Sequence, residues 1–202
     1  MDKFLILKSF LKMISKGKFF TKISSWLLRL LALIVFLSLF YFSYKIWTIY
    51  SDARLTSSGM FCYRLIGQII IAAFLYSILN ILLVRASDIN AIPISTDYTV
   101  IPIIVVLIKT FGEVFAVTFA LICFVDGLSI VFGMPLISTG IGIRIPFSIY
   151  PANYYESGLI LSGLITVVSS LIVGFMILSL FYFVAEQMGV FVDIARNTKK
   201  SN

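Results

Sequence analysis

Four long, nearly charge-free apolar stretches constrain this chain more than any other feature. We expect membrane-spanning helices at about 26–47, 62–84, 101–125 and 158–184, because about 20 apolar residues cross a hydrocarbon core of roughly 30 Å. Hydrophobic residues make up 60% of the chain and charged residues 12%, whereas soluble domains are about 45–50% apolar and about 25% charged. The predicted fold class is an all-α integral membrane protein, with a four-transmembrane-helix bundle in residues 25–202.

Residues 1–24 precede the first span and predict a basic amphipathic helix that lies at the membrane surface. Its lysines recur at four-residue intervals and attract anionic lipid headgroups; the expected headgroup contacts are Lys8, Lys12, Lys16, Lys18 and Lys22. A topogenic tail is the favoured interpretation of this charge, and a lipid-sensing or partner-docking arm is the alternative. At the first span, Trp26 and Trp47 stand where interfacial anchors are expected, and Arg29 can snorkel to the phosphates.

The distribution of Lys and Arg predicts the orientation. The first span is too long for the apolar region of a signal peptide, so we expect it to stay as a signal anchor. The positive-inside rule then places both termini in the cytoplasm, with residues 185–202 as a cytoplasmic tail and residues 127–157 as an outer loop. A linker beginning at Arg85 is expected between the second and third spans. A bacterial inner membrane is the expected location.

The formal charge of +7 and the absence of histidine limit the choice of ligand. The positive charge is concentrated near the N-terminus without a folded basic domain, so we expect no nucleic-acid partner. Without histidine or clustered carboxylates, we predict no metal site and no cofactor. The chain also has no recognisable catalytic motif, and no catalytic residue is assigned.

Lys109 and Glu113 are the two charged residues within the third predicted span. At 1.5 Å per residue they lie about 12 and about 18 Å in from Ile101, which places Glu113 close to the middle of the membrane. They are spaced as an i, i+4 pair and can neutralise each other. One interpretation is an ion or proton relay, since ionisable groups inside a membrane are commonly functional. The favoured one is a structural ion pair.

Small and polar residues mark the expected helix contacts. Small-residue spacing allows close helix packing, and we assign it to Gly112, Ala116 and Ala120 on the third span and to Gly158, Ser162 and Ser169 on the fourth. The fourth-span face is the expected partner of Glu113. Polar residues also suggest a narrow hydrated path bounded by Gln68, Asn80, Lys109, Glu113 and Thr166. Ordinary helix packing is the favoured explanation of these polar stripes.

Within the loop 127–157, residues Pro135–Ile149 alternate apolar with small or polar positions and predict an outer β-hairpin, with a re-entrant loop as the rival. Its apolar character makes it the best candidate for partner docking, through Pro135, Arg144, Tyr150, Tyr154 and Tyr155. Cys62 and Cys123 both lie towards the outer side. A disulfide between them is one interpretation, and two ordinary buried thiols is the favoured one.

These observations favour a non-catalytic structural or accessory subunit of a membrane protein complex, which docks other subunits or copies of itself through the outer loop and helix faces. The alternative is a small oligomeric channel or transporter that uses Lys109 and Glu113. An enzyme ranks third, because Glu113 alone is not an active site.

Overall fold

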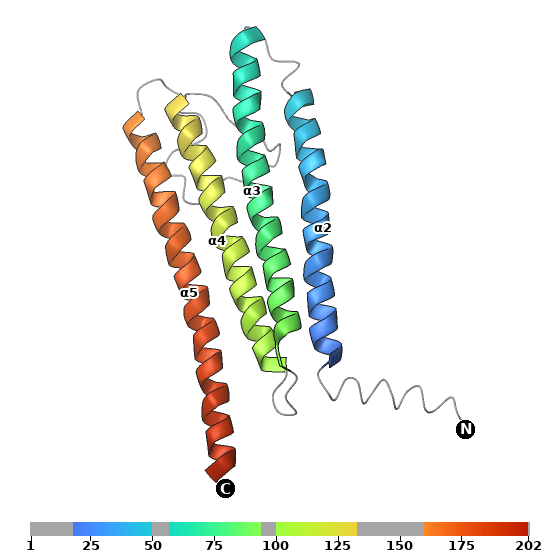
Figure 1. Cartoon of the computed structure of the whole chain (residues 1–202). Coiled ribbons are helices and arrows are strands. Elements are labelled where there is room, and N and C mark those ends of the chain that lie inside the picture. The colour runs from blue at the N-terminus through green and yellow to red at the C-terminus, as the bar shows by residue number, and fades with distance from the viewer. Residues whose placement is uncertain (1–17, 50–56, 94–99, 133–159, 202) are drawn as a thin grey trace, which may run out of the picture. The chain divides into compact units, whose positions relative to one another are not determined.

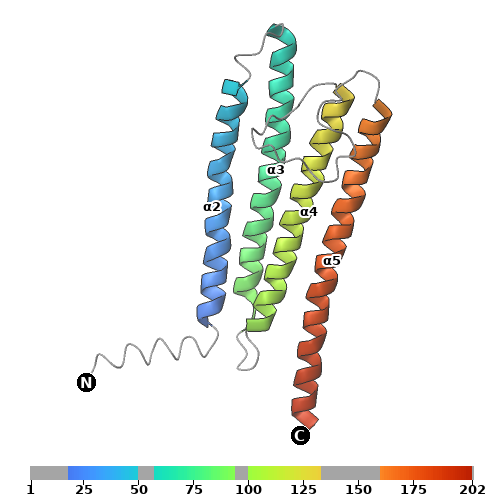
Figure 2. The same ribbon diagram turned by 180° about the vertical axis from the view of Figure 1, so that it is seen from behind.

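A computed structural model describes residues 18–49, 57–93, 100–132 and 160–201 of the chain. These residues form four α-helices and no strand (Figures 1 and 2), namely α2 (Lys18–Ile49), α3 (Ser57–Ala91), α4 (Val100–Phe132) and α5 (Ile160–Ser201). All four are long and apolar enough to cross a membrane. The prediction of an all-helical architecture with four helices of membrane-spanning length is therefore confirmed for the described residues, while the predicted hairpin lies outside them.

All four helices extend beyond the spans that hydropathy predicts, and α4 continues past the predicted end at 125 to Phe132, into the predicted loop 127–157. Residues 18–24 belong to α2 and not to a separate segment, because no Gly or Pro interrupts them. The prediction that Arg85 begins a linker is wrong: α3 continues to Ala91 and stops just before Pro93, which disfavours helical geometry in the residue preceding it. The predicted tail 185–202 continues α5 as far as Ser201. Pro102 is accommodated in the first turn of α4, where its missing N–H costs nothing.

The helices divide along their lengths into two compact units. Unit 1 contains Met1–Leu37, Tyr76–Phe115 and Ile177–Asn202, and unit 2 contains Ser38–Leu75 and Ala116–Met176. Unit 1 thus combines the beginning of α2 with the end of α3, and the beginning of α4 with the end of α5. Successive helices therefore run in opposite directions within it.

Small side chains bring α2 and α3 together in unit 1. The Ser25 hydroxyl donates a hydrogen bond of 3.0 Å to the Ala86 carbonyl oxygen, and both residues are buried. Aliphatic residues from all four helices complete the core of this unit, among them Leu28, Ala32, Leu82, Ile89, Ile103 and Ala185. Because neither Ser25 nor Ala86 has a long side chain, the two backbones can approach closely.

Glycines bring α4 and α5 together in unit 2. A Cβ atom built on Gly163 would lie 2.8 Å from the Gly127 carbonyl oxygen, and one built on Gly127 would lie 2.9 Å from the Gly163 carbonyl oxygen. A Cβ on Gly174 would meet the Cβ of Ala120 at 2.9 Å. The two helices therefore touch backbone to backbone, which is how small residues promote association in membranes.

Polar contacts connect α2 and α3 in unit 2. The Gln68 amide nitrogen donates to the Ser43 hydroxyl at 2.6 Å, and the Arg64 guanidinium lies 5.8 Å from the centre of the Trp47 ring. Trp47 also packs edge-on against Phe61.

Adding one methyl group at Gly163 should destabilise the protein despite the better helix propensity of alanine. We expect Gly163→Ala to lower the free energy of unfolding in detergent by about 1–3 kcal/mol, because the Cβ would be forced against backbone atoms of α4. Gly189→Ala is the matched control. No atom lies within 4 Å of its Cβ position, so it should be neutral or stabilising by up to about 1 kcal/mol. Equal effects of the two substitutions would contradict the close α4–α5 contact.

Candidate functional site

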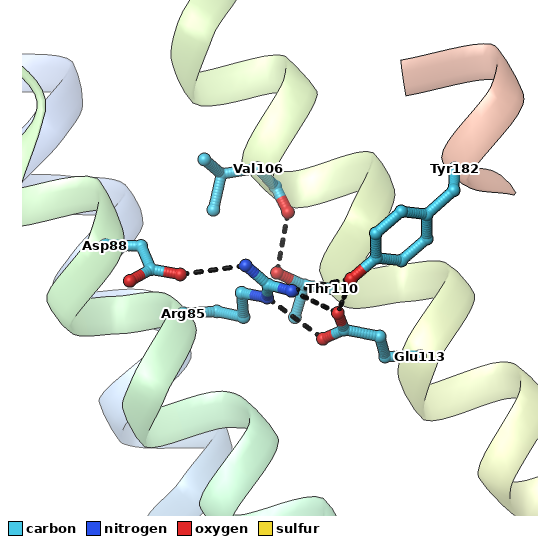
Figure 3. Close-up of polar contacts among 6 residues, drawn as sticks. All are labelled: Arg85, Asp88, Val106, Thr110, Glu113 and Tyr182. Carbon is cyan, nitrogen blue, oxygen red and sulfur yellow. Dashed lines mark hydrogen bonds and ion pairs between the residues drawn. The ribbon is translucent and has the colours of Figure 1, made fainter. Parts of the chain in front are cut away.

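An ion pair between Arg85 of α3 and Glu113 of α4 forms the centre of the most polar cluster in unit 1 (Figure 3). The Arg85 Nε donates to Glu113 Oε2 at 3.0 Å, and its Nη2 donates to Glu113 Oε1. Two parallel bonds of this kind are the strongest arrangement that an arginine and a carboxylate adopt. The pair neutralises both charges inside apolar helices, where a lone charge would be costly.

Tyr182 brings α5 into the same network. Its hydroxyl donates to Glu113 Oε1 and accepts a bond of 2.8 Å from Arg85 Nη2. The phenol is therefore bonded to both members of the ion pair, and Figure 3 shows its hydroxyl directed at the Glu113 carboxylate. Three helices that are distant in sequence are joined at one point.

Asp88 binds Nη1, the guanidinium nitrogen of Arg85 that does not contact Glu113. Its Oδ2 accepts a bond of 2.8 Å from Arg85 Nη1, one helical turn along α3. The side chain of Asp88 is 43% exposed, compared with 21% for Arg85 and 14% for Glu113. The network therefore runs from a buried carboxylate to one that reaches the surface of the unit.

Lys109 stands beside this network and not within the Glu113 ion pair. Its Nζ lies 5.0 Å from the centre of the Tyr182 ring, a distance at which a cation is attracted by the face of an aromatic ring. Among the described residues, the carboxylate of Glu113 is bridged by Arg85 and not by Lys109. In place of the predicted Lys109–Glu113 pair within one helix, Glu113 pairs with Arg85 of another helix. Arginine suits this role because it offers two donors in the geometry that a carboxylate needs.

Gly112 makes room for the segment of α5 that carries Tyr182. A Cβ atom on Gly112 would collide with the Cβ of Phe181 and lie 2.7 Å from its Cγ. Phe181 also packs edge-on against Phe111 and Phe115, whose rings are stacked. Gly112 therefore allows α5 to approach α4 closely enough for Tyr182 to reach Glu113.

The position of Arg85 along α3 places the network closer to the membrane surface than the position of Glu113 along α4 predicts. The stretch 65–84 carries no charged residue and is about 30 Å long, which is the thickness of a hydrocarbon core. Arg85 follows this stretch directly, and the neighbouring Ser25–Ala86 contact brings Trp26, an interface-seeking residue, to the same level. The network therefore lies near one end of the apolar stretch of α3, whereas counting along α4 alone predicts the middle of the membrane for Glu113.

Sequence reasoning missed Arg85, Asp88 and Tyr182 as site residues. The first two were expected in a linker, although nothing between Val84 and Ala91 breaks a helix, and that absence was the available signal. Tyr182 lies in an apolar stretch with no feature that distinguishes it. Its role depends on the register between α4 and α5, which local sequence does not encode.

The residues of the predicted hydrated path belong to both units. Gln68 bonds Ser43 in unit 2, and the Thr166 hydroxyl donates back to the Ser162 carbonyl of its own helix at 2.9 Å. Asn80 belongs to unit 1, where it is exposed on α3. A path that these residues line together stays a prediction.

The predicted packing residues of α4 lie against α5, whereas the buried face of α5 differs from the predicted one. Gly112 meets Phe181 in unit 1, and Ala116 and Ala120 meet Gly174 in unit 2. Gly163, which meets Gly127 and Val131 of α4, is buried together with Ser170 and Gly174. Ser169 is exposed, and Gly158 lies outside the described residues. The buried face of α5 is offset by one residue from the predicted one, because hydroxyl groups that bond their own helix do not require a partner helix.

Several predicted residues fall outside the described part of the chain. These are Lys8, Lys12 and Lys16 of the amphipathic segment and the docking residues Pro135, Arg144, Tyr150, Tyr154 and Tyr155. Lys18 begins α2, and Lys22 is exposed on it. Cys123 is a free, partly buried thiol, and the side chain of Cys62 lies outside the described residues.

Both oxygens of Glu113 accept bonds from Arg85 or Tyr182, and Asp88 accepts from Arg85 as well. Within the described residues, no group of three or more His, Cys, Asp or Glu side chains is placed to hold a metal ion. The arrangement is suited to fixing three helices in register.

Comparisons of the chain with protein-family models, curated proteins and solved structures give no match.

Removing the Tyr182 hydroxyl should weaken the helix bundle measurably. We expect Tyr182→Phe to lower the free energy of unfolding in detergent by about 1.5–3 kcal/mol, the range for a hydrogen bond to a charged group. Tyr76→Phe is the control, because Tyr76 is 66% exposed and its change should be within about 0.5 kcal/mol. A Tyr182→Phe protein as stable as the parent would show that the hydroxyl does not join α5 to the network.

Proposed function

We propose that this chain is a non-catalytic structural or accessory subunit of a membrane protein complex and that it docks a partner helix on the outward face of α3. The observation that carries the proposal is the position of Asn80, a polar side chain exposed on a helix that crosses the membrane. Asn80 lies five residues before Arg85 on α3. At 1.5 Å per residue, this places it about 7.5 Å inside the uncharged stretch 65–84, measured from Arg85. An amide at that depth is disfavoured against lipid and favours a hydrogen-bonding helix partner.

The outward face of α3, formed by Tyr76, Ser77, Asn80, Val84 and Ser87, supports this role. All five residues are exposed. On a helical projection they lie opposite the buried side chains of unit 1, such as Ile78, Leu82 and Ala86. Ser77, Asn80 and Ser87 give this face small and hydrogen-bonding groups, which favour close packing of a second helix in a membrane.

The contacts of Glu113 support a structural role for the interior network. Both oxygens of Glu113 accept hydrogen bonds from Arg85 or Tyr182, which belong to two other helices. The groups that usually carry transport instead hold α3, α4 and α5 together. The channel or transporter alternative is therefore less well supported than the docking role.

The proposed location is a bacterial inner membrane with both termini in the cytoplasm. Unit 1 contains the two chain ends together with Lys22, Arg29 and Arg85, whereas the described cationic residues of unit 2 are Lys45 and Arg64. The positive-inside rule then favours a cytoplasmic position for the helix ends of unit 1. Docking through the loop 127–157 remains a further prediction from its sequence.

Site-specific photo-crosslinking in native membranes tests the docking face. We expect a photoreactive phenylalanine analogue at Tyr76 to give a crosslink to a second polypeptide, because Tyr76 lies one turn from Asn80 on the proposed contact face. The same analogue at Phe183 of α5 is the control, since the two aromatic side chains are similarly exposed, at 66% and 62%. The Tyr76 crosslink should be lost when Asn80→Leu is added.

Two outcomes would contradict the docking role. One is that positions 76 and 183 give the same crosslinks, or only lipid adducts, when the chain is expressed at its native level. The other is that Asn80→Leu leaves the Tyr76 crosslink unchanged.

A further inference from the structure

One face of α2 presents two cations and a tryptophan to the surroundings in unit 1. Lys22, Trp26 and Arg29 are all exposed, with Trp26 at 71%. Their spacing of four and three residues places them on the same side of the helix, which is coloured blue in Figure 1. The face adjoins Ser25, which attaches α2 to α3 through the Ala86 carbonyl, but its own three side chains stay exposed.

Neither cation is neutralised within the described part of the chain. The ion pairs of that part are formed by Arg85, with Asp88 and with Glu113. Lys22 and Arg29 therefore present two positive charges about 10.5 Å apart along the helix axis. Both side chains are long and flexible, so their charged ends can converge on a group that lies between these two positions.

The same face continues as an apolar strip. Leu33 and Leu37 follow Arg29 at four-residue intervals, and both are largely exposed. The face therefore has a cationic part with an indole N–H donor, followed by an apolar part towards the C-terminus of α2. That sequence of groups matches an amphiphile with an anionic head and an acyl chain.

We propose that this face of α2 is a binding site for one anionic phospholipid. Lys22 and Arg29 hold the phosphate from two sides, Trp26 packs at the glycerol level and donates its indole N–H to an ester oxygen, and one acyl chain lies along Leu33 and Leu37. Charge complementarity selects the lipid, because a zwitterionic headgroup carries its own cation next to the phosphate. The sequence predicts general headgroup contacts for the N-terminal lysines, and this proposal adds a defined lipid site on α2. It does not depend on the proposed docking role.

Quenching of Trp26 fluorescence by brominated lipids tests the site. The chain has two tryptophans, so Trp47→Phe leaves Trp26 as the reporter. The protein is reconstituted in phosphatidylcholine vesicles that contain equal small fractions of brominated phosphatidylglycerol or brominated phosphatidylcholine. We expect saturable and stronger quenching by the phosphatidylglycerol, with a preference on the order of fivefold for each cation.

Substitution of the two cations separates a defined site from general attraction. Lys22→Gln with Arg29→Gln should remove the preference, and each single substitution should reduce it. Lys45→Gln is the charge-matched control: Lys45 is exposed near the other end of α2, so this variant should keep the full preference. The Trp26 emission wavelength and the melting temperature of each variant are measured to check folding, and only variants that match the parent in both are compared.

Equal quenching of Trp26 by the two brominated lipids would overturn the proposal. So would a loss of preference in Lys45→Gln as large as that in the double variant, because it would indicate attraction to the whole protein and not to this face.

Discussion

The Arg85–Glu113 ion pair is the interaction on which the rest of unit 1 depends. Apolar helices in a membrane have no hydrophobic force to align them, since lipid tails are as apolar as their side chains. A two-bond pair between α3 and α4, with Tyr182 of α5 bonded to both partners, supplies the specific register that apolar packing does not. Gly112 serves this arrangement by letting Phe181 and its helix come close.

This view separates the polar groups of the chain by what they do. Arg85, Glu113 and Tyr182 satisfy each other and stabilise the fold. Asn80, on the outward face of α3, and the cations on α2 are exposed, and their hydrogen-bonding capacity and charge are directed at other molecules. The function we propose follows from this division, because the chemistry that is turned outward suits recognition of a helix and of a lipid headgroup.

The fold was largely predictable from the sequence, because long apolar runs indicate membrane helices without any knowledge of their neighbours. Glu113 was also found from sequence, since a charge in such a run is conspicuous. Its partner was not, because the residues around Arg85 resembled a polar linker and the α3–α4 register is a non-local property. Hydroxyl spacing misled the choice of packing face on α5, where Gly163 and Gly174 are in contact with α4 and Ser169 is exposed.

The coupling free energy between Arg85 and Glu113 is the most direct test of the account. A double-mutant cycle of Arg85→Gln and Glu113→Gln, followed by reversible unfolding in detergent, should give a coupling of about 2 kcal/mol or more, as for closely bonded charge pairs. The parallel cycle of Lys109→Gln and Glu113→Gln should give less than about 1 kcal/mol, because Lys109 does not bridge the carboxylate. Additive effects in the Arg85 cycle, or a larger coupling in the Lys109 cycle, would contradict the central role of the Arg85–Glu113 pair.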